Sequence, residues 1–265
     1  VIVVKSGRSK AGKRAVASHT GSLVAASEIT VDALFKQSGV IRTDTLEEMF
    51  DVATLLAHQP APAGDRVAII TNAGGLGIMC ADACEANGLQ VLPLADETVA
   101  ELESFLPAEA SAANPVDMIA SAAPADYALT IELVSRDPNV DALIVLYIVI
   151  DDSMASEIAA CIKDGIQAIG RRVPVLTAFM SARGLPPELQ GDDVQVPSYR
   201  FPEQAAIALA KAAAYGKWRN RPPGEIPEIP DIRRDEATSI IATALREGEG
   251  WLSPDRPGWV ITILL

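Results

Sequence analysis

The sequence predicts an α/β protein built on a parallel sheet with helices on both faces. Between residues 66 and 215, apolar runs typical of strands alternate with amphipathic stretches typical of helices. Each strand run is continuously apolar, which indicates burial on both faces of a parallel sheet. About five strands in roughly 150 residues fit a flavodoxin-like, doubly wound domain. The chain has 265 residues, 49% hydrophobic and 22% charged, as in globular proteins.

The chain opens with a short segment that predicts two strands and one helix. Val1 to Lys5 is expected to be a short buried strand, followed by a polar, glycine-bearing loop from Ser6 to Gly21. Ser27 can cap a helix that ends at Gly39. Val40-Ile41 is expected to be one more short strand. The apolar residues spaced i, i+3, i+4 predict that this helix buries Val31, Leu34 and Phe35.

A second helix of this segment starts at a capping box, with Thr45 followed three residues later by Glu48. The apolar face expected on this helix consists of Leu46, Met49, Phe50, Ala53 and Ala57. The stretch "QPAPAGD", residues 59–65, breaks both periodicities and predicts a linker.

The regular alternation begins at Arg66. The expected strands cover residues 66–71, 89–94, 140–150, 173–180 and 194–199. The expected helices cover residues 76–87, 97–106, 124–136, 153–169 and 203–215. A glycine turn, "NAGGLG", joins the first strand to the first helix, and "NPVD", residues 114–117, predicts an ordered turn.

The C-terminal stretch has a different composition. Residues 217–236 are rich in proline, arginine and acids, which predicts a linker. We expect a short helix over residues 237–246, with Trp218 and Trp251 as packing anchors on either side. The last ten residues, "RPGWVITILL", fit no helix or turn pattern.

Charge and composition narrow the classes of function. A formal net charge of −13 opposes binding to nucleic acid. The longest apolar run, residues 142–150, is shorter than the roughly 20 residues of a membrane span, so we expect no membrane partner. Three cysteines in apolar helical patterns predict buried thiols in a reducing compartment, the cytoplasm, and no zinc site. Because the chain starts at a strand rather than at Met, we expect that part of the protein precedes it.

His19, one of two histidines, lies in the small-residue stretch "AVASHTGSLVAASE". Ser18, Thr20 and Gly21 would let backbone amides and the imidazole approach a ligand closely. The residues before it are strongly basic, which favours an anion nearby. Imidazole is a nucleophile at neutral pH and can accept a group covalently. The pattern therefore favours group transfer to an anionic ligand, with a surface or capping histidine as the alternative.

The glycine turn is the second candidate site. Backbone amides at a helix amino terminus form an anion seat, and here Asn72, Gly74 and Gly75 would provide it. The alternative is that the glycines only allow a tight turn. Their spacing does not match the dinucleotide motif, although Asp96 after the second expected strand leaves NAD binding as another interpretation. We assign no chemistry to the NPVD turn, to Asp151-Asp152 or to His58.

Several stretches together resemble the acyl-CoA synthetases of the NDP-forming type, which are ADP-forming acetate–CoA ligases related to succinyl-CoA synthetase. The matching stretches are "VIVVKSGRSKAGKRAVASHTGSL", "GVIRTDTLEEMFDVATLL", "RVAIITNAGGLGIMCADACEANGL", "NPVDM", "DPNVDALIVLY" and "GEGWLSPD". They extend from residue 1 to about residue 255, and the serine-histidine-threonine-glycine loop followed by "NAGGLG" and "NPVD" makes the match specific.

The resemblance implies a mechanism. In that family an acyl phosphate connects the acid with its CoA thioester, and phosphate is passed to a histidine. The phosphohistidine loop then moves to an ATP-grasp domain and phosphorylates ADP; in the other direction ATP activates the acid. His19 falls on the family's phosphorylated histidine. The implied substrates are a carboxylic acid, CoA, phosphate and ADP or ATP, the nucleotide with Mg²⁺.

The resemblance also implies a domain plan. Residues 1–58 would be the C-terminal part of a succinyl-CoA synthetase-like domain with the phosphohistidine loop, and residues 65–216 a flavodoxin-like ligase-CoA domain. Residues 217–265 would be a linker and a truncated start of an ATP-grasp domain. CoA and nucleotide would bind mainly to ATP-grasp and CoA-binding domains or subunits outside this chain. We therefore expect an oligomer and an acid–thiol ligase inactive without those domains; the alternatives are a ligand-sensing regulatory module of a protein acetyltransferase and an inactive remnant.

Overall fold

The computed structural model describes residues 1–7, 9–12, 14–15, 28–170, 172–190, 196–222, 224 and 233–247. It divides into two compact units, Val1–Arg221 and Pro222–Leu265. In the second unit the described residues form helix α9 (Arg234–Glu247), which covers the helix expected over 237–246.

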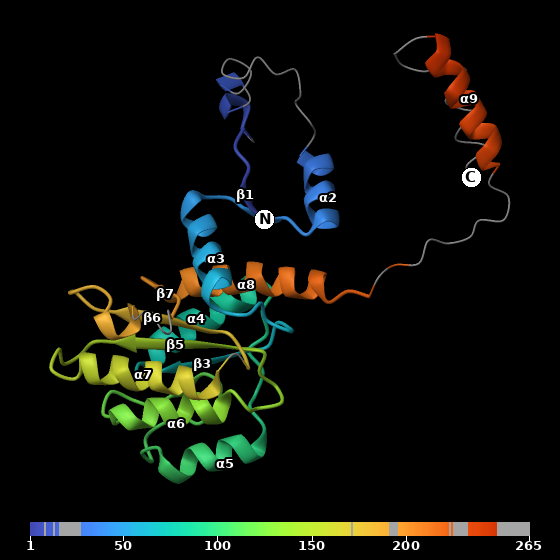
Figure 1. Cartoon of the computed structure of the whole chain (residues 1–265). Coiled ribbons are helices and arrows are strands. Elements are labelled where there is room, and N and C mark those ends of the chain that lie inside the picture. The colour runs from blue at the N-terminus through green and yellow to red at the C-terminus, as the bar shows by residue number, and fades with distance from the viewer. Residues whose placement is uncertain are drawn as a thin grey trace. The chain divides into compact units, whose positions relative to one another are not determined.

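The first unit is built on a five-stranded parallel sheet (Figure 1). Its strands are β3 (Val67–Thr71), β4 (Val116–Asp117), β5 (Ala142–Ile148), β6 (Val175–Met180) and β7 (Ser198–Tyr199). Their spatial order is β4-β3-β5-β6-β7, which is the flavodoxin-like doubly wound order. The expected fold class is therefore confirmed.

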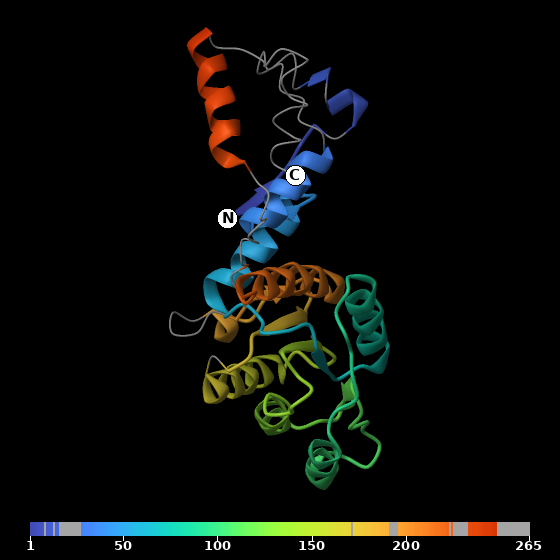
Figure 2. The same ribbon diagram turned by 90° about the vertical axis from the view of Figure 1, so that its right-hand side faces the viewer.

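Helices cover both faces of this sheet (Figures 1 and 2). On one face lie α5 (Asp96–Phe105), α6 (Pro124–Val134) and α7 (Ala155–Ile169). On the other lie α3 (Leu46–His58), α4 (Gly74–Ala86) and α8 (Pro202–Arg219). Successive residues of β5 alternate between the two cores: Val145 packs toward α6 and α7, and Ile144 packs toward α4 and α8.

The second expected strand, residues 89–94, does not form. Only Gln90 pairs with β3, through one isolated bridge at Arg66, and β4 occupies the other end of the same edge. Between them the Asn114 side chain replaces the backbone ladder: its Nδ2 donates to the Val67 and Leu92 carbonyls, and its Oδ1 accepts from the Ile69 amide. The Asn114 side chain thus makes hydrogen bonds that a neighbouring strand would otherwise make. The NPVD segment contains an edge strand, β4, as well as a turn.

The opening segment forms a separate two-stranded parallel sheet with β1 (Ile2–Val4) beside β2 (Ile41–Thr43). Helix α2 (Glu28–Ser38) precedes β2, and Gly39 ends it with φ +66°. The part expected to be loop after Ser6 includes helical backbone at residues 10–12 and 14–15. The predicted strands and helices of this segment are otherwise confirmed, and the expected cap Ser27 lies outside the described residues.

The burial expected for three elements of this segment, β1, α2 and α3, is wrong. β1 is only half-buried, Leu34 of α2 is 57% exposed, and no residue of α2 is fully buried. In α3 the buried residues are Val52 and Leu55, whereas Leu46 and Phe50 of the expected inner face are exposed. The helix packs its other side against α8, and its predicted apolar face borders β1 and β2, which leave Leu46 and Phe50 exposed.

Helix α8 is longer than expected and takes in the start of the predicted linker. Trp218 therefore lies on α8, where its ring stacks on that of Tyr215 at a centroid distance of 5.9 Å. It is a packing anchor, as expected, but within a helix. Trp251 and the last ten residues lie outside the described residues.

Candidate functional site

The amino terminus of α4 is the first part of the candidate site. The helix begins at Gly74, two residues earlier than expected, and its N-cap residue Ala73 makes no side-chain cap. The Gly74 and Gly75 amides have no hydrogen-bond partner among the described residues. A Cβ on Gly75 would meet no atom within 4 Å, so the space beside it is open. Free amides at a helix start attract an anion.

Asn72 fixes this turn to the neighbouring strand. It is buried, its Nδ2 donates to the Ile148 carbonyl over 3.0 Å, and its Oδ1 accepts from the Ile148 amide over 3.0 Å. Ile148 ends β5, so the contact joins the carboxyl ends of β3 and β5. The strand order reverses between these two strands, and doubly wound sheets bind ligands at that point. Asn72 therefore positions the seat, while Gly74 and Gly75 supply the open amides.

Asp117, to which we assigned no chemistry from the sequence, borders the same turn. A Cβ on Gly74 would lie 2.6 Å from its Oδ2, so the carboxylate rests against the backbone of the first helical turn. Its Oδ1 accepts from the Ile119 amide over 3.0 Å. Ile119 has φ +60°, a strained value for a β-branched residue. The carboxylate therefore borders the turn beside the Gly74 Cα, while the space beside Gly75 is open.

A cavity of about 650 Å³ lies at the carboxyl ends of β5, β6 and β7. Polar groups in its wall include Ser181, Ser198 and Arg200, and the Arg200 guanidinium lies 5.2 Å from the Phe201 ring centroid. Ile148, which Asn72 holds, also lines it. Asn72 thus bonds one residue of the cavity wall and lies in the turn before α4. None of these lining residues carries a motif, so the sequence offered no signal for them.

The loop that carries His19 is described only at its base. Ser18, His19, Thr20 and Gly21 lie outside the described residues. On either side of them, Lys5 Nζ lies 2.6 Å from Glu28 Oε1, so this ion pair brings the two ends of the loop together. Arg42 of β2 bonds the same carboxylate and Asp32. Hydrogen bonds from Lys5 and Arg42 lower the pKa of Glu28 to about 2.

The remaining sequence-based candidates lie elsewhere. Asp96 is exposed at the start of α5 and does not follow a strand, so the premise of the NAD interpretation is wrong. Cys80 and Cys84 are buried on α4 as predicted, whereas Cys161 is half-buried. His58 is the last residue of α3. Within the described ranges, no group of three His, Cys, Asp or Glu side chains is placed to hold a metal ion.

Asp151 and Asp152 lie just before α7, at the carboxyl edge of the sheet. The Ser153 backbone amide donates to Asp151 Oδ1 over 2.9 Å, and hydrogen bonds from Ser153 lower the pKa of Asp151. Asp152 pairs with Arg183 over 3.1 Å. None of the described helices combines the length and apolar character that crossing a membrane requires.

Two family models match the chain. The model described as a Ligase-CoA domain matches residues 67–212, and the model described as a succinyl-CoA ligase like flavodoxin domain matches residues 1–56. Together they take in the five-stranded sheet and the two-stranded segment before it.

Proteins with these domains are similar over most of the chain. The alpha subunit of ADP-forming acetate–CoA ligase II from Pyrococcus furiosus is 43% identical over 213 residues, covering 78% of this chain and 46% of that protein. The ADP-forming 4-hydroxybutyrate–CoA ligase of Nitrosopumilus maritimus is 33% identical, covering 93% of this chain and 35% of that protein.

A solved structure of dinucleotide-forming acetyl-coenzyme A synthetase 1 from Ca. Korarchaeum cryptofilum, in complex with phosphate and ADP, aligns with a TM-score of 0.74. It is 32% identical and is covered to 47%, while 82% of this chain is aligned. The chain thus spans about half or less of the relatives it matches. By its sequence, its fold and these matches, the chain belongs to the NDP-forming acyl-CoA synthetase family, with its Ligase-CoA domain at residues 67–212.

Proposed function

We propose that this chain is the phosphoryl-carrying part of an ADP-forming acyl-CoA synthetase, an acid–thiol ligase. The reaction converts a carboxylic acid, CoA and ATP to acyl-CoA, ADP and phosphate, and runs in both directions. Its relatives are named ADP-forming CoA ligases. The single observation that carries the proposal is the open amino terminus of α4 at the switch point of the sheet.

The proposed chemistry passes one phosphoryl group through His19. A ring nitrogen of His19 attacks the γ-phosphorus of ATP, and ADP leaves. A carboxylate oxygen of the acid then takes the phosphoryl group, which releases the imidazole and gives an acyl phosphate. The CoA thiolate attacks the acyl carbon, the C–O bond breaks and phosphate leaves. Each step exchanges one bond for another, so no oxidant or further reactant is needed.

The α4 seat would hold the phosphoryl group while it is transferred. The free amides of Gly74 and Gly75 would donate to its oxygens, and the helix dipole favours their negative charge. Ser18, Thr20 and Gly21 would provide close backbone approach on the His19 side. The Lys5–Glu28 pair brings the described ends of this segment together.

Substrates, partners and domains complete the proposal. The names of the relatives favour a short aliphatic acid such as acetate or 4-hydroxybutyrate. We place CoA and the nucleotide mainly on CoA-binding and ATP-grasp domains or subunits, in an oligomer. Mg²⁺ would come with the nucleotide, and no step on this chain passes through it. Three free cysteines support the cytoplasm as the compartment.

The proposed domain division places the histidine-carrying part at residues 1–58, the ligase-CoA domain at 65–216 and a linker with a partial ATP-grasp start at 217–265. The matched family models support the first two parts. The regulatory-module alternative is not favoured, because the relatives are named as ligases.

Phosphate binding at the α4 seat tests this proposal on the chain by itself. Titration with inorganic phosphate should shift the amide resonances of Gly74 and Gly75 in ¹H–¹⁵N spectra. Gly75→Asp has room for its side chain and places a carboxylate in the seat, so it should weaken phosphate binding by about tenfold or more.

Ala86→Asp is the matched control, because it puts the same charge at the exposed far end of α4. It should leave phosphate binding unchanged. Absence of shifts at Gly74 and Gly75, or equal phosphate affinity in Gly75→Asp, would rule out the seat.

A further inference from the structure

A separate cavity of about 630 Å³ lies between α2, β2 and the carboxyl half of α8. None of its lining residues belongs to α4 or to the loops that follow β3 to β6. Its wall has four cationic side chains and two carboxylates, although the chain as a whole has a net charge of −13. Such a local reversal of charge favours an anionic ligand.

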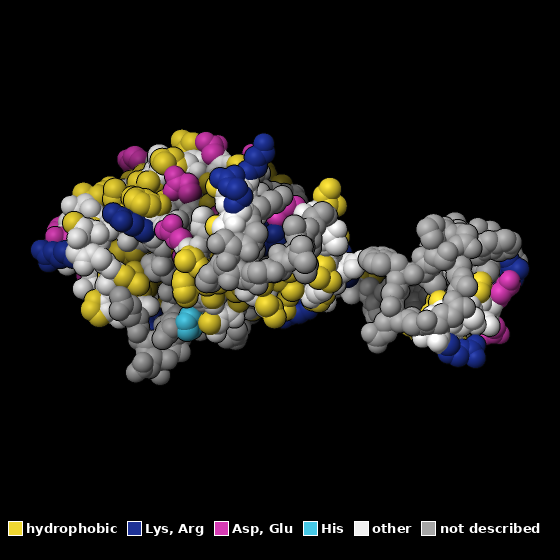
Figure 3. All heavy atoms as spheres, turned by 90° about the horizontal axis from the view of Figure 1, so that it is seen from above, with side chains coloured by type: hydrophobic (Ala, Val, Ile, Leu, Met, Phe, Trp, Pro, Cys, Tyr) yellow, Lys and Arg dark blue, Asp and Glu magenta, His cyan; other side chains and the backbone are white. Residues whose placement is uncertain are grey.

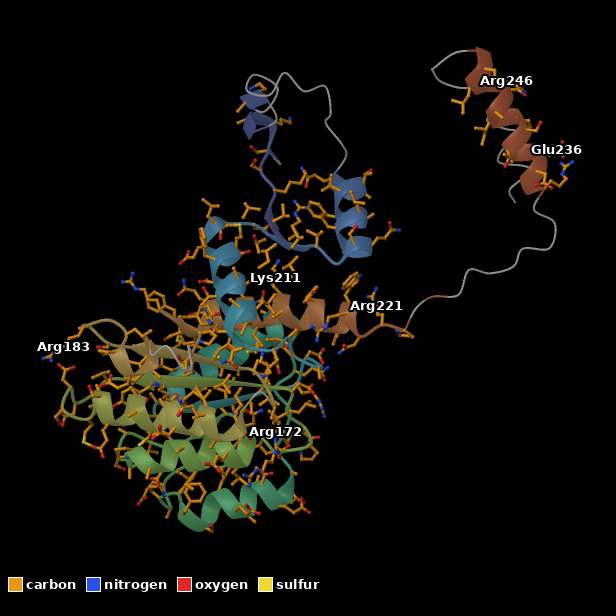
Figure 4. All side chains as sticks on the ribbon, in the orientation of Figure 1. Arg172, Arg183, Lys211, Arg221, Glu236 and Arg246 are labelled. Carbon is orange, nitrogen blue, oxygen red and sulfur yellow. The ribbon has the colours of Figure 1, made fainter. Side chains whose placement is uncertain are left out.

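Three of the cations are available to a ligand. Arg42 donates hydrogen bonds to Glu28 and Asp32, and these bonds raise the pKa of its guanidinium. Lys36, Lys211 and Arg221 form no ion pair within the described part of the chain. Figure 4 shows Lys211 on α8 and Arg221 just beyond its carboxyl end. Three cationic side chains without an ion-pair partner can bind the negatively charged oxygens of a diphosphate group.

One wall of the cavity is aromatic. The Trp218 and Tyr215 rings stack at 5.9 Å with an interplanar angle of 18°, and Phe35 lies across the cavity on α2. A Cβ on Gly39 would lie 2.3 Å from the Trp218 ring, so only glycine lets the indole rest against this turn. Gly39 also has φ +66°, which favours glycine for a second reason. Flat aromatic surfaces of this kind stack planar rings.

We propose that this cavity binds a nucleoside diphosphate group. The base would stack against the wall of Trp218 and Tyr215, and the phosphates would contact Lys36, Lys211 and Arg221. The cavity volume lies within the range of roughly 300–1,000 Å³ that is usual for small-molecule sites. The same group occurs in free ADP and in the 3′-phospho-ADP part of CoA. The site is distinct from the α4 seat, so binding here does not depend on the proposed phosphoryl transfer.

Isothermal titration calorimetry of the whole chain with ADP, CoA, adenosine and pyrophosphate tests the site. We expect ADP to bind, and adenosine and pyrophosphate each to bind about tenfold more weakly or worse, because each keeps only half of the contacts. Lys211→Gln should weaken ADP binding about tenfold. Lys163→Gln, an equally half-buried lysine on α7 across the sheet, should leave it unchanged.

If ADP and CoA compete for the site, the diphosphate group that they share is recognised. If ADP binds and CoA does not, the site is specific for the free nucleotide. Lys36 is exposed, so Lys36→Gln tests the site without a risk to folding. Three results would overturn the proposal: no ADP binding to the unmodified chain, unchanged ADP affinity in both lysine variants, or pyrophosphate binding as tightly as ADP.

Discussion

The five-stranded sheet and the two-stranded sheet of this chain use similar local sequence, yet their burial differs. All five residues of β3 are buried, whereas all three residues of β1 are only half-buried. Strand β3 has partners on both sides and helices over both faces. Strand β1 pairs with β2 alone among the described residues. Burial therefore follows the number of neighbours rather than the apolar character of the strand itself.

Helix α3 shows the same contrast within one element. Its inner residues Val52 and Leu55 are 0% exposed because they pack into the core beneath α8. Its outer residue Phe50 is 62% exposed and borders a groove of about 620 Å³ that Val1 and Ile2 also line. In Figure 3, too, hydrophobic side chains are exposed at several places between charged ones. The first segment keeps apolar surface that the ligase-CoA domain does not cover.

The largest expected effect is on global stability, and it separates the two sheets. Ile144→Ala in the central strand removes a fully buried side chain, so it should lower the free energy of unfolding by about 2–5 kcal/mol. Phe50→Ala should change it by less than about 0.5 kcal/mol, because the ring is exposed. Urea unfolding followed by circular dichroism measures both. A loss for Phe50→Ala equal to that for Ile144→Ala would mean that another copy of the chain covers this face.

A smaller difference in stability is expected between the loss of the Arg66–Asp141 ion pair and the loss of the Lys5–Glu28 ion pair. Asp141 is buried and accepts from Arg66 Nε and Nη2 over 2.8 and 2.7 Å, so Asp141→Asn should lower the free energy of unfolding by about 1.5–3 kcal/mol. Glu28→Gln at the more exposed Lys5 pair should cost less, but it should speed trypsin cleavage after Arg14, because it releases one end of the His19 loop.

The stability of these two variants relative to the unmodified chain should depend on pH, because each variant removes a carboxylate whose pKa is lowered by folding. Hydrogen bonds from their partners lower the pKa of both Asp141 and Glu28 in the folded chain. Each therefore stabilises the fold above its unfolded pKa, and this stability is lost as the pH falls through the folded pKa. For Glu28 the window runs from 4.5 down to about 2. The gap in unfolding midpoint between the unmodified chain and each variant should shrink in acid; a gap that is constant from pH 7 to pH 2.5 would contradict the assignment.

The elements with strong local patterns were predictable from the sequence. Continuous apolar runs predicted β3, β5 and β6. The capping box predicted the start of α3, where Thr45 Oγ1 accepts from the Glu48 amide. Residues 89–94 look like a strand locally, but Asn114 lies more than twenty positions away and takes over the pairing. Such a replacement has no local signal.

The site was predictable to a similar degree. The strand-to-helix turn of Asn72, Gly74 and Gly75 was predictable because a glycine turn at this place has a known geometry, and its role as an anion seat stays a prediction. Asp117 was missed because β4 has only two residues, too few for a pattern that would place its carboxylate at the sheet edge. The inner face of α3 was missed because that helix has apolar residues on two sides, and only the tertiary neighbours decide between them.

The most direct test of the proposed phosphoryl transfer is radiolabelling of His19. The chain is incubated with γ-³²P-ATP and the CoA-binding and ATP-grasp domains of an ADP-forming acetate–CoA ligase. It should acquire a label that is labile in acid and stable in base, as a phosphohistidine is. His19→Asn should abolish the label, and addition of acetate and CoA should discharge it from the unmodified chain. Label that persists in His19→Asn, or that acetate and CoA do not remove, would contradict a phosphoryl carrier at this position.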